Sequence, residues 1–283
     1  MKKLISKILF LAIALVASKT GTTQYYYKSI VQLKQTKQNF ESLVKAKVKT
    51  VNVTAADAED KVLENFKITQ KISGQNQLIT ISSAQSSQET VTTTSFNAQF
   101  YPTRITDSSM FTLSTATYTY NSNGLLQELS SVSADPTDSN NYAFRERQVF
   151  TYNKNGLPQK MFRIKDGSDT VEVRFIIDSI ENVPAIEEWW SKGLRIEAWY
   201  YIFDSNKNLT GILRKSKRGQ LLPDYLFEYN EDGTLSNYTT VTPGTSNYKI
   251  FYYKYNDLGL KDGELILNKQ KQSEGSIDYE YIL

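Results

Sequence analysis

Apolar and polar residues alternate along most of the chain, with aromatic side chains at every second position of many stretches. Residues 199–203 (WYYIF) carry rings at their first, third and fifth positions, and residues 225–229 (YLFEY) repeat the arrangement 26 residues later. Residues two apart lie on the same face of a strand. The pattern therefore predicts strands with one buried aromatic face and one largely hydrated face, as is typical of antiparallel sheets.

A turn signal follows each aromatic stretch. Asparagine or aspartate comes directly after the last ring at Asn121, Asn153, Asp204, Asn230 and Asn256, and glycine comes three residues later at Gly124, Gly156, Gly233 and Gly259. Asparagine and aspartate hydrogen-bond their own backbone two residues on, and glycine adopts a positive φ without steric cost. Because the aromatic stretch and the turn keep a common register, each unit predicts one β-hairpin.

The hairpin unit recurs to the end of the chain. The last position of each aromatic stretch falls at Tyr120, Tyr152, Ile177, Phe203, Tyr229, Tyr255 and Tyr281. These units predict 13 strands, and two weaker units from Lys67 onward would raise the number to 17. Open sheets rarely exceed about 10 strands without curling. The sequence predicts a mainly β fold: a single curled antiparallel β-meander of tandem hairpins of about 26 residues, aromatic face inward, with a short helical N-terminal segment.

The amino terminus has the layout of a secretory signal peptide. In residues 1–23, two lysines precede an unbroken apolar run at residues 8–17, and small and polar residues follow. The run is too short to cross a bilayer, which needs roughly 20 apolar residues. We expect cleavage between Ala17 and Gln24, and hence an exported protein that is periplasmic, secreted or held at the cell surface.

Two further segments complete the predicted organisation. Residues 24–66 form an N-terminal segment that is partly helical, because Phe40 and Leu43 belong to an apolar set at helical spacing. A second helix is predicted after Thr54, a plausible N-cap. Residues 67–283 form the β-hairpin repeat domain.

Composition excludes several classes of function. The formal charge of +3 includes four lysines in the predicted signal peptide, and without them 29 basic residues face 30 acidic ones. A near-neutral chain gives no support to nucleic-acid binding. The basic residues that begin at Arg214 are expected to form a solvated hairpin tip rather than a grip for an acidic polymer.

The chain has no cysteine and no histidine. This excludes disulfides, a lipid-modified cysteine, thiol nucleophiles, histidine-dependent triads and ordinary zinc sites. We predict no cofactor, no metal and no catalytic residue, and therefore a protein without enzymatic activity.

The irregular unit around Ile177 carries the candidate ligand-binding residues. All three tryptophans, Trp189, Trp190 and Trp199, lie in or just after it, and Tyr201 follows. Trp189 and Trp190 are neighbours, so in a strand at least one should leave the core. Exposed tryptophans can stack on a sugar ring or anchor a protein partner. The alternative is a wide hairpin whose tryptophans cap the rim of the sheet.

Carboxylates leave one enzymatic alternative open. A glycan hydrolase would need two carboxylates about 5–9 Å apart in a cleft. Glu187 and Glu188 are adjacent, so in a strand they point to opposite faces and cannot form such a pair. Asp166, Asn182 and Asp204 are better explained as turn-forming residues.

Three segments resemble a known family of repeats. FTYNKNGL (150–157), FEYNEDGTL (227–235) and YKYNDLGL (253–260) look like YD repeats, the tandem β-hairpins of Rhs and teneurin-type shells. The resemblance covers about residues 115–283, although asparagine follows the second aromatic more often than aspartate. It implies a β-hairpin fold, and it implies encapsulation, adhesion or carbohydrate contact as family functions. The chain has too few predicted strands to enclose a passenger.

The favoured prediction is an exported, non-enzymatic repeat protein that binds a glycan or an envelope protein, with no stable membrane insertion and an undetermined oligomeric state. The alternative architecture is an outer-membrane β-barrel. The signal peptide and the alternating terminus SIDYEYIL favour the barrel. Aromatic residues in the middle of the strands and charges on the other face oppose it, because membrane barrels keep aromatic residues in two girdles.

Overall fold

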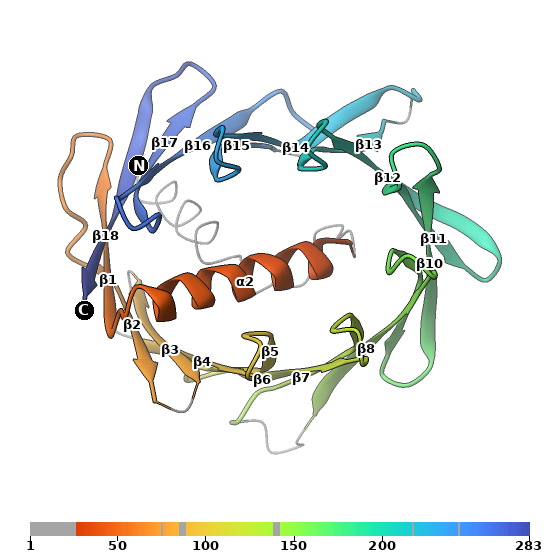
Figure 1. Cartoon of the computed structure of the whole chain (residues 1–283), viewed down its shortest axis with the longest axis horizontal. Helices are drawn as coiled ribbons and strands as arrows, with labels where there is room; N and C mark the ends of the chain where they lie inside the picture. Colours follow the sequence, from red (N-terminus) through yellow and green to blue (C-terminus); the bar gives the residue numbers. More distant parts are fainter. Residues whose placement is uncertain (1–26, 75, 85–88, 138–141, 217, 243) are drawn as a thin grey trace.

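The computed structural model describes residues 27–283 except 75, 85–88, 138–141, 217 and 243. The predicted signal peptide lies outside the described residues. The described chain forms one helix and one sheet of 18 strands. Each strand pairs with the next in sequence, and β1 also pairs with β18, so the sheet closes into a barrel (Figure 1).

The helix is α2 (Tyr27–Lys45). The strands are β1 (Thr50–Asp57), β2 (Phe66–Ser73), β3 (Gln77–Ala84), β4 (Glu89–Phe96), β5 (Pro102–Ser108), β6 (Leu113–Tyr120), β7 (Leu126–Ala134), β8 (Ala143–Tyr152), β9 (Pro158–Lys165), β10 (Asp169–Asp178), β11 (Val183–Ser191), β12 (Leu194–Phe203), β13 (Leu209–Lys215), β14 (Leu221–Tyr229), β15 (Leu235–Val241), β16 (Tyr248–Tyr255), β17 (Lys261–Asn268) and β18 (Ser273–Ile282).

The closed barrel corrects the prediction of a curled meander, which did not specify whether the sheet closes. The missing strand is β1, which comes from the N-terminal segment and pairs with β18 from Thr50↔Ile282 to Asp57↔Gly275. The second helix predicted after Thr54 is wrong for the same reason. Val51, Val53 and Ala55 alternate with exposed or half-exposed residues and are buried in a strand, so the sheet extends upstream of residue 67.

The aromatic face of the sheet points into the barrel, as the alternation predicts. Figure 1 shows α2 inside the ring of strands. The Tyr27 ring on this helix lies 6.4 Å from the Phe175 ring and 5.0 Å from the Tyr201 ring. Because side chains alternate along a strand, Ile176 and Ile202 point outward, and both are exposed.

The turns have the predicted chemistry. Between β8 and β9, the Asn153 side-chain oxygen accepts hydrogen bonds from the backbone N–H groups of Asn155 (2.9 Å) and Leu157 (3.0 Å). Gly156 has a φ of +77°, which a residue with a Cβ adopts only with strain. A register shift lies just before the last aromatic residue, between Thr151 and Tyr152, and it increases the local twist of the hairpin.

Tyrosine hydroxyls tie five of the seven hairpin units named above to the preceding unit, and the units that end in Ile177 and Phe203 have no tyrosine at this position. The hydroxyl at the last aromatic position donates a hydrogen bond to the backbone carbonyl of the first residue of an earlier strand: Tyr120 to Pro102 (2.6 Å), Tyr152 to Leu126 (2.7 Å), Tyr229 to Leu209 (2.9 Å), Tyr255 to Leu235 (2.9 Å) and Tyr281 to Lys261 (2.6 Å). A phenylalanine could not donate this bond. The recurrence of tyrosine at this position is thereby explained.

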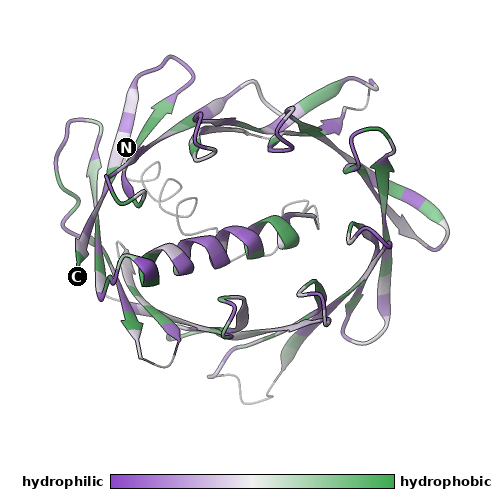
Figure 2. Ribbon diagram, in the orientation of Figure 1, coloured by the Kyte–Doolittle hydropathy of each residue, from purple (hydrophilic) through white to green (hydrophobic). Residues whose placement is uncertain are grey.

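The core has two parts, one at each end of α2. One cluster joins Leu33 of the helix to Phe150, Val173 and other residues of β7–β13. The other joins Leu43 to Val51, β2 and the last strands of the barrel. Between the two, the helix is hydrophilic (Figure 2). The helix therefore packs against the wall at its ends.

The pairing of β1 with β18, which we call the seam, leads to a prediction. Gly275 has a φ of +144°, and a Cβ added there would lie 2.5 Å from the carbonyl oxygen of Ala56. Gly275→Ala should therefore force the two seam strands apart and lower the free energy of unfolding by about 1–3 kcal/mol. Urea unfolding followed by tryptophan fluorescence measures this loss.

Gly263→Ala is the matched control, because a Cβ at Gly263 meets its nearest atom at 3.5 Å. Its free energy of unfolding should stay within about 0.5 kcal/mol of the wild type, or rise slightly. Equal stability of Gly275→Ala and Gly263→Ala would contradict the close approach of Gly275 to the Ala56 backbone.

Candidate functional site

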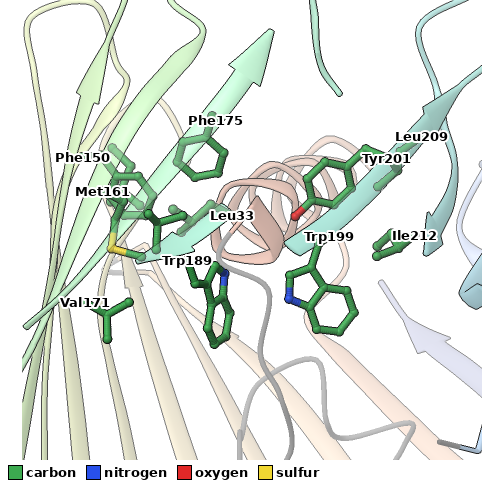
Figure 3. Packing of buried hydrophobic residues seen from close by; sticks show 12 residues of the cluster. Leu33, Phe150, Met161, Val171, Phe175, Trp189, Trp199, Tyr201, Leu209 and Ile212 are labelled. Carbon is green, nitrogen blue, oxygen red and sulfur yellow. The ribbon is translucent and has the colours of Figure 1, made fainter. Parts of the chain in front are cut away.

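A buried carboxylate on the inner wall holds the start of α2. Glu187 of β11 is 0% exposed. It accepts hydrogen bonds from the Trp189 indole N–H (2.6 Å), the Tyr201 hydroxyl (2.6 Å) and the Tyr27 backbone N–H (2.8 Å). Figure 3 shows Trp189, Trp199 and Tyr201 gathered beside the helix. We call Glu187, Trp189, Trp199, Tyr201 and Tyr27 the Glu187 cluster.

Strand alternation and register build this cluster. Glu187 and Trp189 are two apart on β11, so they share the inner face. Glu187 lies opposite Trp199 on β12, and Tyr201 is two residues further along that strand. The first N–H groups of a helix have no partner within the helix, and a negative charge there is favourable. The Glu187 carboxylate supplies that partner to Tyr27.

Three of the four predicted ligand-binding residues come together here, and the fourth does not. Trp189, Trp199 and Tyr201 face inward, whereas Trp190 faces outward. Its indole N–H donates to Glu188 (3.3 Å), and the Arg174 guanidinium lies 4.3 Å from the ring centroid. The expectation that adjacent tryptophans separate is confirmed.

The buried tryptophans offer little surface to a ligand. Trp199 is 2% exposed, and Trp189 and Tyr201 are also buried. A sugar ring stacks on an open aromatic face, and these faces are covered in the described structure. The geometry of the cluster suits a site that fixes the start of α2 to the barrel wall. Glycan binding by these residues stays a prediction.

An ion pair continues the inner wall beyond the cluster. Arg214 of β13 makes two parallel bonds to Asp224 of β14, with Nε–Oδ2 at 2.5 Å and Nη2–Oδ1 at 2.8 Å. Its guanidinium lies 5.0 Å from the Trp199 ring centroid. The prediction that Arg214 belongs to a solvated tip is wrong, because Arg214 lies opposite Trp199 in the register and shares its inward face.

The other end of α2 is held by stacked rings. The Phe40 ring lies 3.7 Å from the Phe96 ring at an interplanar angle of 2°, and 6.0 Å from the Phe100 ring. Phe40 is 1% exposed. The sequence predicts a helical face for Phe40 but cannot name its partners, because they lie more than 50 residues away, in and after β4.

The middle of α2 carries exposed polar residues. Lys34, Gln38 and Asn39 are exposed. Glu41 bonds Lys45 (2.9 Å) and Lys37 (3.0 Å), and these hydrogen bonds lower the pKa of Glu41. At 1.5 Å per residue, the helix of 19 residues is about 28 Å long. Because its two ends are fixed to different sectors of the wall, α2 crosses the lumen as a bar.

The outer wall of the barrel differs from its aromatic interior. Ion pairs lie on it, for example Arg147–Glu128 (2.8 Å), Lys160–Glu172 (2.8 Å) and Arg195–Glu188 (2.7 Å). The prediction that Glu187 and Glu188 point to opposite faces is confirmed. Within residues 27–283, outside the gaps already given, no helix has the length and apolar character needed to cross a bilayer. The same residues contain no group of side chains arranged to hold a metal ion.

Comparisons with known proteins give only distant similarities. No protein family and no curated protein matches the sequence. A porin-like protein from Bacteroides uniformis is similar in structure, with 9% identity and a TM-score of 0.39 over 83% of this chain and 98% of that one.

Two toxin structures are similar at the same level. The Photorhabdus luminescens Tc holotoxin pore has 12% identity and a TM-score of 0.33 over 77% of this chain, and TcdB2–TccC3 has 11% and 0.33 over 78%. The chain spans 12% of each of those two proteins. TM-scores of 0.33 to 0.39 are too low to show a common fold or a common function. The YD-repeat resemblance therefore stays a prediction.

The closed barrel corrects the prediction of no stable membrane insertion. That prediction depended on charges on the other face of the strands and on aromatic residues in the middle of the strands, which membrane barrels keep to two girdles. In this barrel the aromatic residues face the lumen. They therefore give no evidence against contact between lipid and the outer wall. Every sheet edge is paired, and a closed antiparallel barrel with an even number of strands is one of the architectures that can span a membrane.

The Glu187 cluster generates a prediction about docking of the helix. Glu187→Leu removes the acceptor of two buried donors and one partly buried donor, and each buried donor left unsatisfied costs about 1–3 kcal/mol. We expect α2 to undock, with faster hydrogen exchange of its amides and a lower free energy of unfolding. Glu188→Leu is the control, because Glu188 lies on the outer wall. If hydrogen exchange of the α2 amides is unchanged in Glu187→Leu, Glu187 does not fix the helix to the barrel wall.

A second prediction concerns pH. Burial raises the pKa of Tyr27 to about 12, whereas an unfolded tyrosine ionises near pH 10. The contribution of Tyr27 to stability is therefore complete below about pH 10 and is lost as the pH rises toward 12.

Tyr27→Phe removes this titration while keeping the ring. The free energy of unfolding of the wild type should fall relative to that of Tyr27→Phe across that pH window, as measured by urea unfolding at successive pH values. A difference that stays constant with pH would contradict the assignment.

Proposed function

We propose that the mature chain is an exported, non-enzymatic β-barrel of the cell envelope that works at the outer membrane with its lumen crossed by its own helix α2. The observation that carries the proposal is the closure of all 18 strands around a helix that is fixed at both ends. The predicted signal peptide supports export.

Closure supports membrane contact through backbone chemistry. In a bilayer core, each unpaired backbone N–H or C=O group costs several kcal/mol. An open meander would present two rows of such groups, whereas here β1 pairs along its whole length with β18. Single-chain outer-membrane barrels have even numbers of strands from 8 upward, and 18 lies within that series.

The way in which α2 is held supports a role for it as an obstruction in the lumen. Its N-terminal end is bonded to Glu187, and the Ser29 hydroxyl donates to the Gln148 side-chain oxygen (3.2 Å). Its other end is held by the Phe40–Phe96 stack. A helix that only filled space would be apolar all round, but α2 keeps an exposed polar face. This arrangement suits a bar that narrows a hydrated lumen.

Cell fractionation tests the proposal. The full-length chain, expressed with its signal peptide in a Gram-negative host, should sediment with outer membranes, resist extraction by sodium carbonate at high pH and dissolve in detergent. Recovery in the soluble periplasmic fraction without detergent would refute the membrane part of the proposal. Gly275→Ala provides a variant with a disturbed seam, and we expect its retention in the membrane to fall with its stability.

A further inference from the structure

A hollow lies on the rim of the barrel between two neighbouring turns. One turn joins β6 to β7 at residues 121–125, and the other joins β8 to β9 at residues 153–157. The volume of the hollow is about 330 Å³, close to the lower end of the usual range for small-molecule sites, roughly 300–1,000 Å³. Its polar lining includes Asn121, Gln127, Thr151, Asn153 and Lys154. We call it the rim pocket.

The two turn-forming asparagines have amide donors to spare. The Asn121 Oδ1 atom accepts hydrogen bonds from the backbone N–H groups of Asn123 and Leu125, both at 3.0 Å. The Asn153 Oδ1 atom accepts the corresponding bonds in its own turn, at 2.9 and 3.0 Å. A backbone N–H can bond only to the oxygen, so these contacts fix which way each amide points. Among the described residues, neither Nδ2 group has a hydrogen-bond partner, so both stay available to a ligand.

Lys154 gives the rim pocket a positive charge. It lies at the tip of the β8–β9 turn and is exposed. Among the described residues that line the pocket, none is acidic. The four turns that follow along the rim, residues 178–182, 204–208, 230–234 and 256–260, are different. Their acids are Asp178, Glu181, Asp204, Glu231, Asp232 and Asp257, with Lys207 as the single base. An anion is therefore favoured at the rim pocket over those turns.

The grooves on either side of the rim pocket are filled. On one side, a Cβ added at Gly124 would meet the Tyr101 ring at 3.7 Å, so that ring covers the turn. On the other side, the Asn155 side-chain nitrogen donates a hydrogen bond to the Asn182 side-chain oxygen (3.3 Å) and joins the next two turns. The opening between the β6–β7 and β8–β9 turns is therefore not a general feature of the rim.

The rim pocket is formed before any ligand arrives. The Tyr152 hydroxyl donates to the Leu126 carbonyl (2.7 Å) and fixes the end of β8 to the start of β7. A Cβ added at Gly156 would meet the Leu125 side chain at 3.6 Å, so the two turns are in contact. Phe150, which belongs to the lining, is 4% exposed and anchored in the core. A site held in this way loses little conformational freedom on binding.

The chemistry of the lining selects the ligand. Amide N–H groups and an ammonium group recognise a carboxylate through charge-assisted hydrogen bonds. The side chains of Gln127 and Thr151 can both donate and accept, which suits hydroxyl groups. The Tyr152 ring adds apolar surface.

We infer that the rim pocket binds a small hydroxylated carboxylate anion, a sugar acid of monosaccharide size. The inference goes beyond the proposed function and holds whether or not the barrel enters a membrane. The site is distinct from the tryptophans predicted to bind a ligand.

Titration with glucuronate tests the inference. The purified full chain, labelled with ¹⁵N, receives increasing glucuronate while the amide signals of Asn123 and Gly156 are followed by NMR. We expect both signals to shift and saturate. Glucose, which has the same ring without the carboxylate, should cause no saturable shift at the same concentrations. Absence of a saturable shift with glucuronate, or equal binding of glucose, would overturn the inference.

An isosteric substitution removes the amide donor and keeps the turn. Aspartate forms the same turn elsewhere on the rim, because the Asp204 Oδ1 atom accepts from the N–H groups of Asn206 (2.9 Å) and Asn208 (2.8 Å). Asn153→Asp should therefore fold normally while it places a negative oxygen where the Nδ2 group was. The affinity for glucuronate should fall at least about tenfold.

Asn256→Asp is the matched control. The Asn256 Oδ1 atom accepts from the N–H groups of Leu258 and Leu260, both at 3.0 Å, in a turn on another part of the rim. This variant should bind glucuronate as the wild type does. Circular dichroism verifies that both variants fold. Equal affinity of Asn153→Asp and Asn256→Asp would overturn the inference.

A second variant keeps the test independent of the turn. Lys154→Gln changes only an exposed side chain, and it should weaken glucuronate binding about two- to fivefold and reduce its dependence on salt. Lys207→Gln, in the β12–β13 turn, should have no effect. Unchanged binding in Lys154→Gln would overturn the assignment of an anion to the rim pocket.

Discussion

The pairing of β1 with β18 is the constraint on which the rest of the structure depends. It converts a row of hairpins into a ring and leaves no strand edge unpaired. The closed ring has an interior, and the aromatic residues are buried in this interior around α2. Without this pairing the alternation of rings and polar residues would still form hairpins, but the lumen, the Glu187 cluster and the distinction between two walls would not exist.

Much of the fold could be predicted from the sequence because local chemistry determines it. The aromatic alternation, the Asn-x-x-Gly turns and the helical spacing at Phe40 all act within a few residues, and the structure has them where they were expected. Closure could not be predicted, because β1 pairs with residues more than 200 positions away and its short stretch, TVNVTAAD, also fits a helix. Strand pairing at such separation leaves no local signal.

The candidate site was predictable only in part. Alternation correctly separates Glu187 from Glu188 and Trp189 from Trp190, because that separation depends on strand geometry alone. That Glu187 receives the first N–H of α2 depends on where a distant helix crosses the barrel. Arg214 was assigned to a loop because its neighbours are basic, whereas register places it beside Trp199. A basic residue at an inward position opposite an aromatic one is the signal that could have identified it.

The position of α2 directly before β1 has a consequence for assembly. Only residues 46–49 connect the helix to β1, and the ring closes where β18 pairs with β1. The carboxyl end of α2 is therefore held within a few residues of the pair of strands that closes the ring, so the helix and the closing strands are neighbours from the start.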